Sequence, residues 1–329
     1  MKKTGIILLL SILLSACLFS QEINVKFEQE KIVGAYENAA DEYIFKCPEN
    51  ISIDKNGDIY LSDYTYCKIN VYDRNFKFIR TIGNMEQGAG EFQQIDKMSL
   101  SENGMMIVWD KINSRFTLFD MNQKFIRTFK LARGLIKTVD PKYIGWIGED
   151  KILIYNRESG LSSSTKEDEK LFHIIDIKQE KILESFGRAE DICDLKNSFL
   201  RKTQVGIENL RLIIINSDSV LIVPEFYFGD LYLFHKGRSI WRLNRIKGVN
   251  PGQKPYKIYG IWKPGDKRGK YIMTMNFEGG QKYLYLPRHV TIGFFRLSNG
   301  CYVHLLFEPV KNKKYYGVQL FDPKLNYLG

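Results

Sequence analysis

One segment of this chain occurs twice, and this duplication constrains the fold more than any other feature of the sequence. Ser52–Ile82 and Ser99–Phe129 align without gaps at a shift of 47 residues, and 11 of the 31 aligned positions are identical. Most other positions exchange one apolar residue for another. Internal repeats with a period of about 40–50 residues are typical of β-propellers and solenoids.

Each copy of the repeat predicts four short strands. In the first copy we expect strands at Ile51–Ile53, Ile59–Leu61, Ile69–Tyr72 and Phe76–Ile79. An Asn-Gly pair at 56–57 separates the first two strands and is a strong hairpin signal. No apolar period of 3.6 residues runs through either copy, which disfavours a helical repeat. Four antiparallel strands joined by tight turns form one propeller blade.

Weaker copies continue along the chain. Further strand pairs are expected at 151–155 with 171–176, 220–223 with 231–235, and 298–304 with 318–324, whereas 256–295 has strands in poor register. Asp322 falls where Asp73 and Asp120 fall in the clear copies. The 313 residues after position 16 contain between six and seven periods. We therefore predict an all-β, six-bladed propeller with four-stranded antiparallel blades, closed by an N-terminal strand at Glu22–Ile32.

The N-terminus predicts export. Lys2 and Lys3 precede an apolar run of ten residues, which is too short to span a bilayer. Leu14, two small residues and Cys17 then resemble a bacterial lipobox, in which the cysteine is acylated and becomes the mature N-terminus. The alternatives are ordinary signal peptidase cleavage after Ser20 or an uncleaved anchor. We predict a signal peptide at 1–16, an anchor and linker at 17–23 and a propeller domain at 24–329.

The lipobox also bears on location and partners. Several acyl chains on Cys17 would anchor the protein stably in a membrane. Leu18 rather than Asp follows that cysteine, and by resemblance to enterobacterial sorting this indicates the outer membrane. Without Lys2 and Lys3 the chain has 46 Lys and Arg against 38 Asp and Glu, with no block of five like charges. An exported chain without a recognition motif is not expected to bind nucleic acid.

Three motifs carry a resemblance to a known family. They are the hairpins Asn56–Asp63 and Asn103–Asp110, the units Val71–Arg80 and Leu118–Arg127, and the Gly-rich connection Gln87–Phe92. Together they resemble six-bladed propellers of the NHL-repeat type, and most closely a group of bacterial lipoproteins. That group tends to have a proline where this chain has Ala89, so the third motif matches in part. The resemblance implies a fold and not an activity.

The second and third strands of each blade are joined on the face that we expect to bind, because its loops are the longer ones. The candidate ligand residues on this face are Asp63, Tyr64, Tyr66, Lys68, Glu91, Asp110, Arg115, Phe226 and Tyr227. Asp63 and Asp110 have an alternative role, in which each caps its own turn through side-chain hydrogen bonds. Phe226 and Tyr227, with Phe228, either form an exposed aromatic contact or pack against a neighbouring blade. The polar loop Arg157–Lys170 is an expected insertion on this face.

The cysteines and histidines give no catalytic pattern. Cys47 and Cys67 belong to one blade and face the same side, so a disulfide between them is one interpretation, and free buried thiols are the other. Cys193 and Cys301 have no comparable argument. Three of the four histidines lie in apolar strands, and no HExxH, G-x-S-x-G or Walker sequence occurs.

Two functions are the main candidates from the sequence, and a purely structural assembly subunit is a third. The first is a lipid-anchored, monomeric binding module for an envelope protein, peptide or glycan, with no catalytic residues and no cofactor. The second is a metal-dependent hydrolase or lyase similar to the lactonases, which hold a cation such as Ca²⁺ near the central channel. Glu91, Asp96, Asp110 and Glu225 are the candidate ligands for that cation.

Overall fold

The structure is a computed structural model of the whole chain. It describes residues 34, 39–86, 88–131, 139–156, 170–194, 196, 210–227, 229–238, 240–247, 256–261, 273–276, 282–287, 290–310 and 313–328. Apart from a 3₁₀ turn, Asp41–Tyr43, and a one-turn helix α2, Ala189–Ile192, the elements of this part of the chain are strands. The predicted closing strand at 22–32, the signal peptide with Cys17, and the loop at 157–169 lie outside the described residues.

The two clear repeats form the first two blades, as the sequence predicts. The first sheet contains β1 (Pro48–Ile53), β2 (Ile59–Asp63), β3 (Lys68–Tyr72) and β4 (Phe78–Ile82). The second contains β5 (Ile95–Leu100), β6 (Met106–Asp110), β7 (Arg115–Phe119) and β8 (Phe125–Phe129). All neighbouring strands in these sheets pair antiparallel.

The weaker repeats form the next two four-stranded sheets. The third contains β9 (Pro141–Trp146), β10 (Lys151–Asn156), β11 (Phe172–Asp176) and β12 (Lys181–Phe186). The fourth contains β13 (Arg211–Asn216), β14 (Ser219–Val223), β15 (Asp230–Gly237) and β16 (Ile240–Lys247). The chain is therefore an all-β propeller with four-stranded antiparallel blades, as predicted, whereas the described residues form five blades around the axis and not the predicted six.

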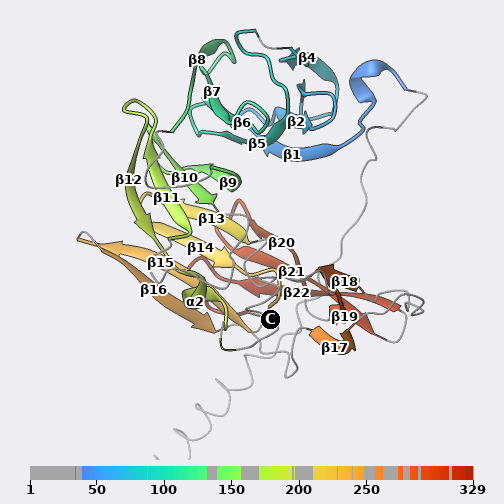
Figure 1. Cartoon of the computed structure of the whole chain (residues 1–329), viewed down its shortest axis with the longest axis vertical. Coiled ribbons are helices and arrows are strands. Elements are labelled where there is room, and N and C mark those ends of the chain that lie inside the picture. The colour runs from blue at the N-terminus through green and yellow to red at the C-terminus, as the bar shows by residue number, and fades with distance from the viewer. Residues whose placement is uncertain are drawn as a thin grey trace, which may run out of the picture.

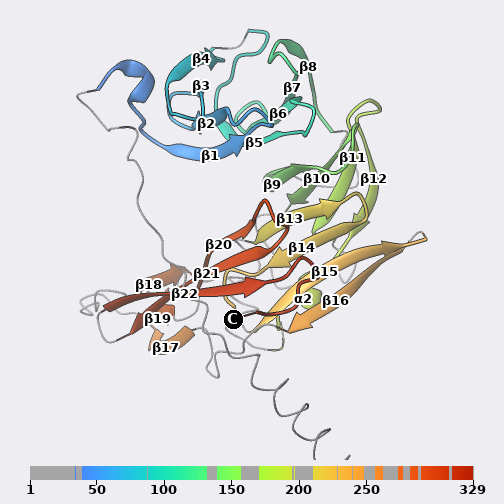
Figure 2. The same cartoon turned by 180° about the vertical axis from the view of Figure 1, so that it is seen from behind.

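Two sheets of three described strands complete the chain. One contains β17 (Tyr256–Ile261), β18 (Met273–Asn276) and β19 (Lys282–Pro287), and the other β20 (Val290–Arg296), β21 (Tyr302–Val310) and β22 (Lys313–Phe321). The inner strand β13 packs directly beside β20. Figures 1 and 2 accordingly show β17–β19 to the side of β20–β22 and not between the fourth and last blades. Sheet β17–β19 comes from the segment whose register was poor in the sequence.

Apolar clusters fill the spaces between neighbouring blades. β6 is buried along its whole length because it is covered on both faces. Met106 and Val108 pack toward the first blade, whereas Ile107 and Trp109 pack toward the third. The same arrangement joins the third blade to the fourth and the fourth to the sheet β20–β22. Burial on both faces explains why the middle strands read as continuous apolar runs rather than alternating ones.

The isoleucines of β1 differ from this pattern. Ile51 and Ile53 are 63% and 64% exposed, whereas Met98, which aligns with Ile51 in the repeat, is 6% exposed. Met98 is covered by the preceding first blade. Among the described residues no blade covers β1 in the same way.

Aspartates shape the turns before the outer strands. Asp73 Oδ1 accepts hydrogen bonds from the main-chain nitrogens of Asn75 and Lys77 at 2.8 and 2.9 Å. Asp120 and Asp322 make the same pair of bonds in their own blades. The predicted equivalence of Asp322 with the two repeat aspartates is thereby confirmed. Such bonds are typical of Asx turns.

Candidate functional site

The inner strands of five blades surround a cavity at the centre of the ring. Its volume is about 570 Å³, and β1, β5, β9, β13 and β20 or residues next to them line it. This volume falls within the roughly 300–1,000 Å³ typical of ligand pockets. The charged lining residues are Glu49, Lys97, Lys142 and Arg211, and the aromatic ones are Tyr143, Phe294 and Phe295. The cavity is therefore the strongest candidate for a binding site.

A β-bulge recurs near the start of three inner strands. The pairing of β1 with β2 shifts between Pro48 and Asn50, which leaves Glu49 as the extra residue. Asp96 in β5 and Lys142 in β9 occupy the corresponding extra positions. A bulge places an unpaired residue on one strand and changes the direction of its side chain. Three blades thus bring a charged residue to the same level of the channel wall.

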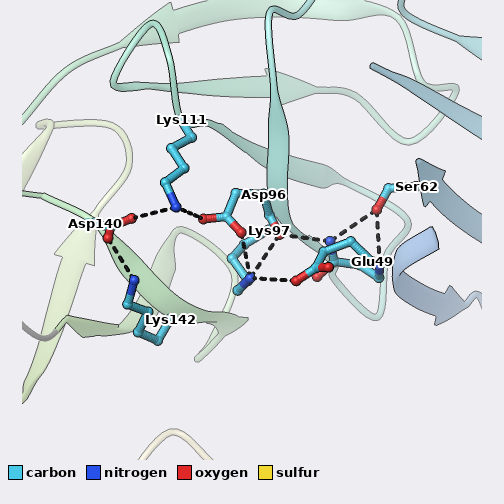
Figure 3. Close-up of polar contacts among 8 residues, drawn as sticks. Glu49, Ser62, Asp96, Lys97, Lys111, Asp140 and Lys142 are labelled. Carbon is cyan, nitrogen blue, oxygen red and sulfur yellow. Dashed lines mark hydrogen bonds and ion pairs between the residues drawn. The ribbon is translucent and has the colours of Figure 1, made fainter. Parts of the chain in front are cut away.

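These residues form a continuous network of ion pairs, shown in Figure 3. Lys97 Nζ lies 3.3 Å from Glu49 Oε1 and 2.7 Å from Asp96 Oδ1. Lys111 Nζ lies 3.4 Å from Asp96 Oδ2 and 3.7 Å from Asp140 Oδ1. Asp140 in turn contacts Lys142 at 2.7 Å. Positive and negative groups therefore alternate from the first blade to the third, and we call these six residues the charged belt.

Two features of the belt show that it is partly withdrawn from water. The side chain of Asp96 is 8% exposed and that of Lys97 is 18% exposed. Burial acts to lower the pKa of Lys111, but the carboxylates of Asp96 and Asp140 outweigh this effect and raise that pKa above its usual value. Lys111 is therefore charged at neutral pH.

An amide reinforces the belt between the first two blades. Asn50 Nδ2 donates to Ser62 Oγ at 3.0 Å and to the main-chain oxygen of Asp96 at 2.9 Å. The second bond crosses from β1 to β5. The cavity wall is consequently held by hydrogen bonds and ion pairs between blades as well as within them.

Asp63 and Asp110 have the structural role that the sequence left open. Asp63 is 1% exposed, and its Oδ1 accepts from Thr65 N and Tyr66 N at 2.9 and 2.8 Å. Its Oδ2 accepts from Lys46 N and Cys47 N, in the segment that leads into β1. Each aspartate therefore fastens a turn to the start of an inner strand, and neither lines the cavity.

Asp110 has the same role in the second blade and also forms an ion pair with Arg115. Its carboxylate accepts from Gln93 N, Gln94 N and Asn113 Nδ2, and it pairs with Arg115 Nε at 3.3 Å. Arg115 also donates to the main-chain oxygen of Glu91 at 2.7 Å. In the third blade Asn156 replaces the aspartate and accepts from Asp140 N at 2.8 Å. Arg115 is thus committed to a contact within the blade.

The other predicted face residues of the first blade cluster around one ring. Lys46 Nζ and Lys68 Nζ lie 5.0 and 5.1 Å from the centroid of Tyr66. Tyr64 lies next to this group and is half-buried. Glu91 uses Oε2 to accept from Gly88 N at 2.8 Å. These residues do not line the central cavity.

The expected exposed aromatic contact at 226–227 is wrong, and the alternative of packing between blades is right. Phe226 is 2% exposed and Tyr227 is fully buried. Phe226 packs in the cluster between the third and fourth blades, and Tyr227 packs in the cluster between the fourth blade and β20–β22. Tyr227 also lies edge-on to His304 at 4.6 Å. Phe228 lies outside the described residues.

The disulfide between Cys47 and Cys67 is not formed in this structure. Both cysteines are free thiols. Cys67 is buried, and its Sγ donates to the main-chain oxygen of Gln93 at 3.1 Å. This contact directs the thiol toward the second blade. Burial raises the pKa of Cys67, which keeps it in the unreactive thiol form.

The proposed cation ligands do not converge. Asp110 is occupied by amides and Arg115, Asp96 by two lysines, and Glu91 by a main-chain amide. The described part of the chain holds no group of three or more His, Cys, Asp or Glu side chains arranged to bind a metal ion. Within that same part, no helix is both long and apolar enough to cross a membrane.

Most of the residues that line the cavity were not predicted from the sequence as ligand-binding residues. Glu49 of the lining and Asp96 of the charged belt are acidic residues 47 positions apart, so the repeat could have pointed to both of them. Lys142, Arg211 and Phe295 lie in weaker copies of the repeat, where no clear register gives their positions. Their convergence depends on how five sheets are arranged around one axis.

Comparisons with known proteins agree with this architecture. A family model, DUF5128, described as a 6-bladed beta-propeller, matches residues 38–237, which is more than half of the chain. No curated protein matches the sequence. One similar solved structure is a member of the DUF4221 family from Bacteroides vulgatus, with a TM-score of 0.54, 10% identity, and coverage of 87% of this chain and 81% of the other.

A second similar structure comes from Bacteroides fragilis and is described as a candidate exported protein. It has a TM-score of 0.54 and 12% identity, and the match covers 88% of this chain and 72% of the other. At these identities both structures support the fold and carry no information on the ligand. The match over 38–237 establishes the family, and the chain belongs to the DUF5128 family of six-bladed β-propellers.

Proposed function

We propose that this protein is an exported, lipid-anchored binding module of the bacterial cell envelope, and that its ligand binds in the central cavity. The observation that carries this proposal is the cavity of about 570 Å³ that five inner strands enclose. Ligand sites in proteins are concave, mostly apolar, and contain a few polar groups that orient the ligand. The cavity combines aromatic and aliphatic side chains with four charged residues in this manner.

A binding role fits the chemistry of the belt better than a catalytic one. A general acid or base needs a carboxyl or amine whose proton exchanges near the working pH. The carboxylates of Glu49, Asp96 and Asp140 are instead occupied by ion pairs with lysines. Such pairs fix the shape and charge of a wall.

The location follows from the N-terminal sequence. Cys17 supplies the lipid anchor, and Leu18 after it favours the outer membrane. The candidate exported protein from Bacteroides fragilis has a similar fold, which is consistent with export of this chain. Membrane fractions of cells producing the protein, washed with carbonate, test this point. The wild type should remain in the membrane and Cys17→Ala should be released, whereas a variant that stays bound would contradict the lipid anchor.

The binding role is tested by crosslinking in native cells, followed by affinity purification of the tagged protein and mass spectrometry. An envelope protein or glycan recovered with the bait would support the proposal. Crosslinks through Lys111, a member of the charged belt, would place the contact near the cavity. Recovery of the bait alone, across several crosslinkers, would contradict a stable macromolecular partner.

The melting temperature with and without a chelator distinguishes the binding role from the metal-dependent alternative. A propeller that holds Ca²⁺ in its channel is stabilised by that ion, because binding to the native state raises its stability by mass action. The melting temperature of the purified protein should be the same with and without a chelator if the binding role is correct. A clear drop on adding chelator, reversed by Ca²⁺, would favour a hydrolase or lyase of the lactonase type.

A further inference from the structure

The four charged residues that line the central cavity differ in how they are paired. Glu49 and Lys97 pair with each other, and Lys142 pairs with Asp140. Arg211, at the start of β13, has no carboxylate within ion-pair distance among the described residues. Its residue is exposed, although its side chain contributes to the cavity wall. The cavity therefore carries one cation whose charge no described group offsets.

An unpaired guanidinium on the wall of a cavity is suited to bind an anion. Arginine stays protonated at all physiological pH values and presents a planar set of donors that matches a carboxylate in a two-bond geometry. The charged belt balances three lysines against three carboxylates, so among the described residues Arg211 gives the cavity wall its excess positive charge. Lys97 and Lys142 are held by their own partners, which leaves Arg211 as the group free to make the direct contact.

The remaining wall indicates what the anion is attached to. Phe295 is 52% exposed and lines the cavity from β20. Tyr143 and Phe294 add aromatic surface beside it. Ser52 and Ser99 occupy equivalent positions on β1 and β5, and both are partly exposed lining residues. An aromatic surface with nearby hydroxyl groups suits a ring that has an apolar face and a hydroxylated edge, which is the character of a sugar.

We propose that the cavity binds an acidic saccharide, with the carboxylate of a uronic acid on Arg211 and the sugar ring against Phe295. This inference rests on the proposed binding function and names the class of its ligand. A carboxyl-terminal peptide offers the same charge, but it lacks the hydroxylated ring. The peptide is therefore an outcome that the test must distinguish.

The test is calorimetric titration of the purified protein with matched ligands. The probes are tetragalacturonate, its fully methyl-esterified form, a hyaluronan tetrasaccharide, and a tetrapeptide with a free carboxyl terminus. Esterification keeps the size of the sugar and removes its charge. We expect at least one of the two acidic tetrasaccharides to bind, and we expect the ester to bind at least tenfold more weakly than tetragalacturonate when tetragalacturonate is the ligand.

Three variants separate charge, geometry and general surface effects. Arg211→Gln should weaken binding of the acidic sugar at least tenfold, and Arg211→Lys should recover part of the loss because it retains the charge without the two-bond geometry. Arg242→Gln is the matched control, since Arg242 is an exposed arginine on the outer strand of the same blade. It should bind like the wild type. Phe295→Ala should weaken binding of the acidic sugar without changing the preference for acid over ester.

Several results would overturn the assignment. Equal affinity for acid and ester, or unchanged binding by Arg211→Gln, would remove the role of the charge. Binding of the peptide and not of the sugars would replace the saccharide with a protein ligand. Failure of every probe to bind would reject the acidic saccharide, and the crosslinking experiment would then decide separately whether the protein is a binding module.

Discussion

The indole Nε1 of Trp146 donates a hydrogen bond of 3.1 Å to the main-chain oxygen of Ser99. Trp146 is the last residue of β9, and Ser99 lies in β5, so this bond joins the inner strands of the third and second blades. It is one of the polar contacts that hold the channel wall from blade to blade, together with the bond from Asn50 to Asp96.

Replacing Trp146 with Phe should destabilise the protein by about 1 kcal/mol, because an intramolecular hydrogen bond contributes roughly 0.5–1.5 kcal/mol. Urea denaturation of the purified protein measures this loss. Ser99→Ala is the matched control: the acceptor is a main-chain oxygen, so the bond survives and stability should change little. A Trp146→Phe variant as stable as the wild type would show that the bond does not hold the two blades together.

The exposed face of β1 gives a prediction that uses the repeat as its own control. Ile51 is 63% exposed and the aligned Met98 is 6% exposed. Ile51→Ala should therefore change the free energy of unfolding by less than about 0.5 kcal/mol, as exposed substitutions usually do. Met98→Ala should cost about 2–5 kcal/mol, as is typical for truncation of a buried methionine. Equal costs at both positions would mean that another part of the chain covers β1 in solution.

The two kinds of repeated aspartate should differ in their contribution to stability. Asp110 is fully buried, accepts several hydrogen bonds and pairs with Arg115. Asp110→Ala leaves Arg115 and several amides without their partner, and breaking a buried pair costs roughly 3–5 kcal/mol. Asp120 closes an exposed turn with two hydrogen bonds, so Asp120→Ala should cost about 1 kcal/mol. Denaturation curves that reverse this order would contradict the structural role given to Asp110.

Two buried histidines predict a loss of stability in mild acid. Burial lowers the pKa of His173 to about 4 and that of His304 to about 4, below the usual value of about 6.5. Both are neutral in the folded protein at pH 7, and the unfolded chain takes up protons first as the pH falls. Folding stability is therefore complete above about pH 6.5. Each histidine removes about 1.4 kcal/mol per pH unit between that pH and about 4.

Unfolding free energies measured from pH 7.5 to 4.5 check this behaviour. His173→Gln should flatten the curve, and His304→Gln should do the same if it folds, since Thr291 and Gln319 can bond to a glutamine amide as they do to the imidazole. His235→Gln on an exposed strand position is the control and should leave the slope unchanged. A wild-type curve without slope in this range would contradict the burial of the two rings.

The repeat made the local structure of the first two blades predictable. The Asn-Gly hairpins, the turns at Asp73 and Asp120, and the capping role considered for Asp63 all depend on residues within a few positions of one another. The same local pattern identified Asp322, 202 positions after Asp120, because its turn uses the same hydrogen bonds. Where the pattern weakens, after residue 130, the sequence predicts strands without placing them.

What could not be predicted depends on contacts between distant segments. Phe226 is buried against the third blade and forms a bridge with Val290, 64 positions further on. Nothing local distinguishes it from an aromatic residue on an exposed loop. The cavity residues Glu49 and Arg211 likewise come from strands more than 150 residues apart. They line one cavity because the sheets are arranged in a ring, and the sequence of a single repeat does not specify that arrangement.

The bulges at Glu49, Asp96 and Lys142 separate the pairing of the inner strand from the choice of the charged side chain that the blade contributes. The residues on either side of the bulge pair with the neighbouring strand and keep the inner strand in register. The bulged residue itself has no partner in that pairing. A single codon change there alters the group that one blade contributes to the charged belt without removing a strand-pairing partner from that blade. The chemistry of the belt can thus vary blade by blade while the pairing of each inner strand is kept.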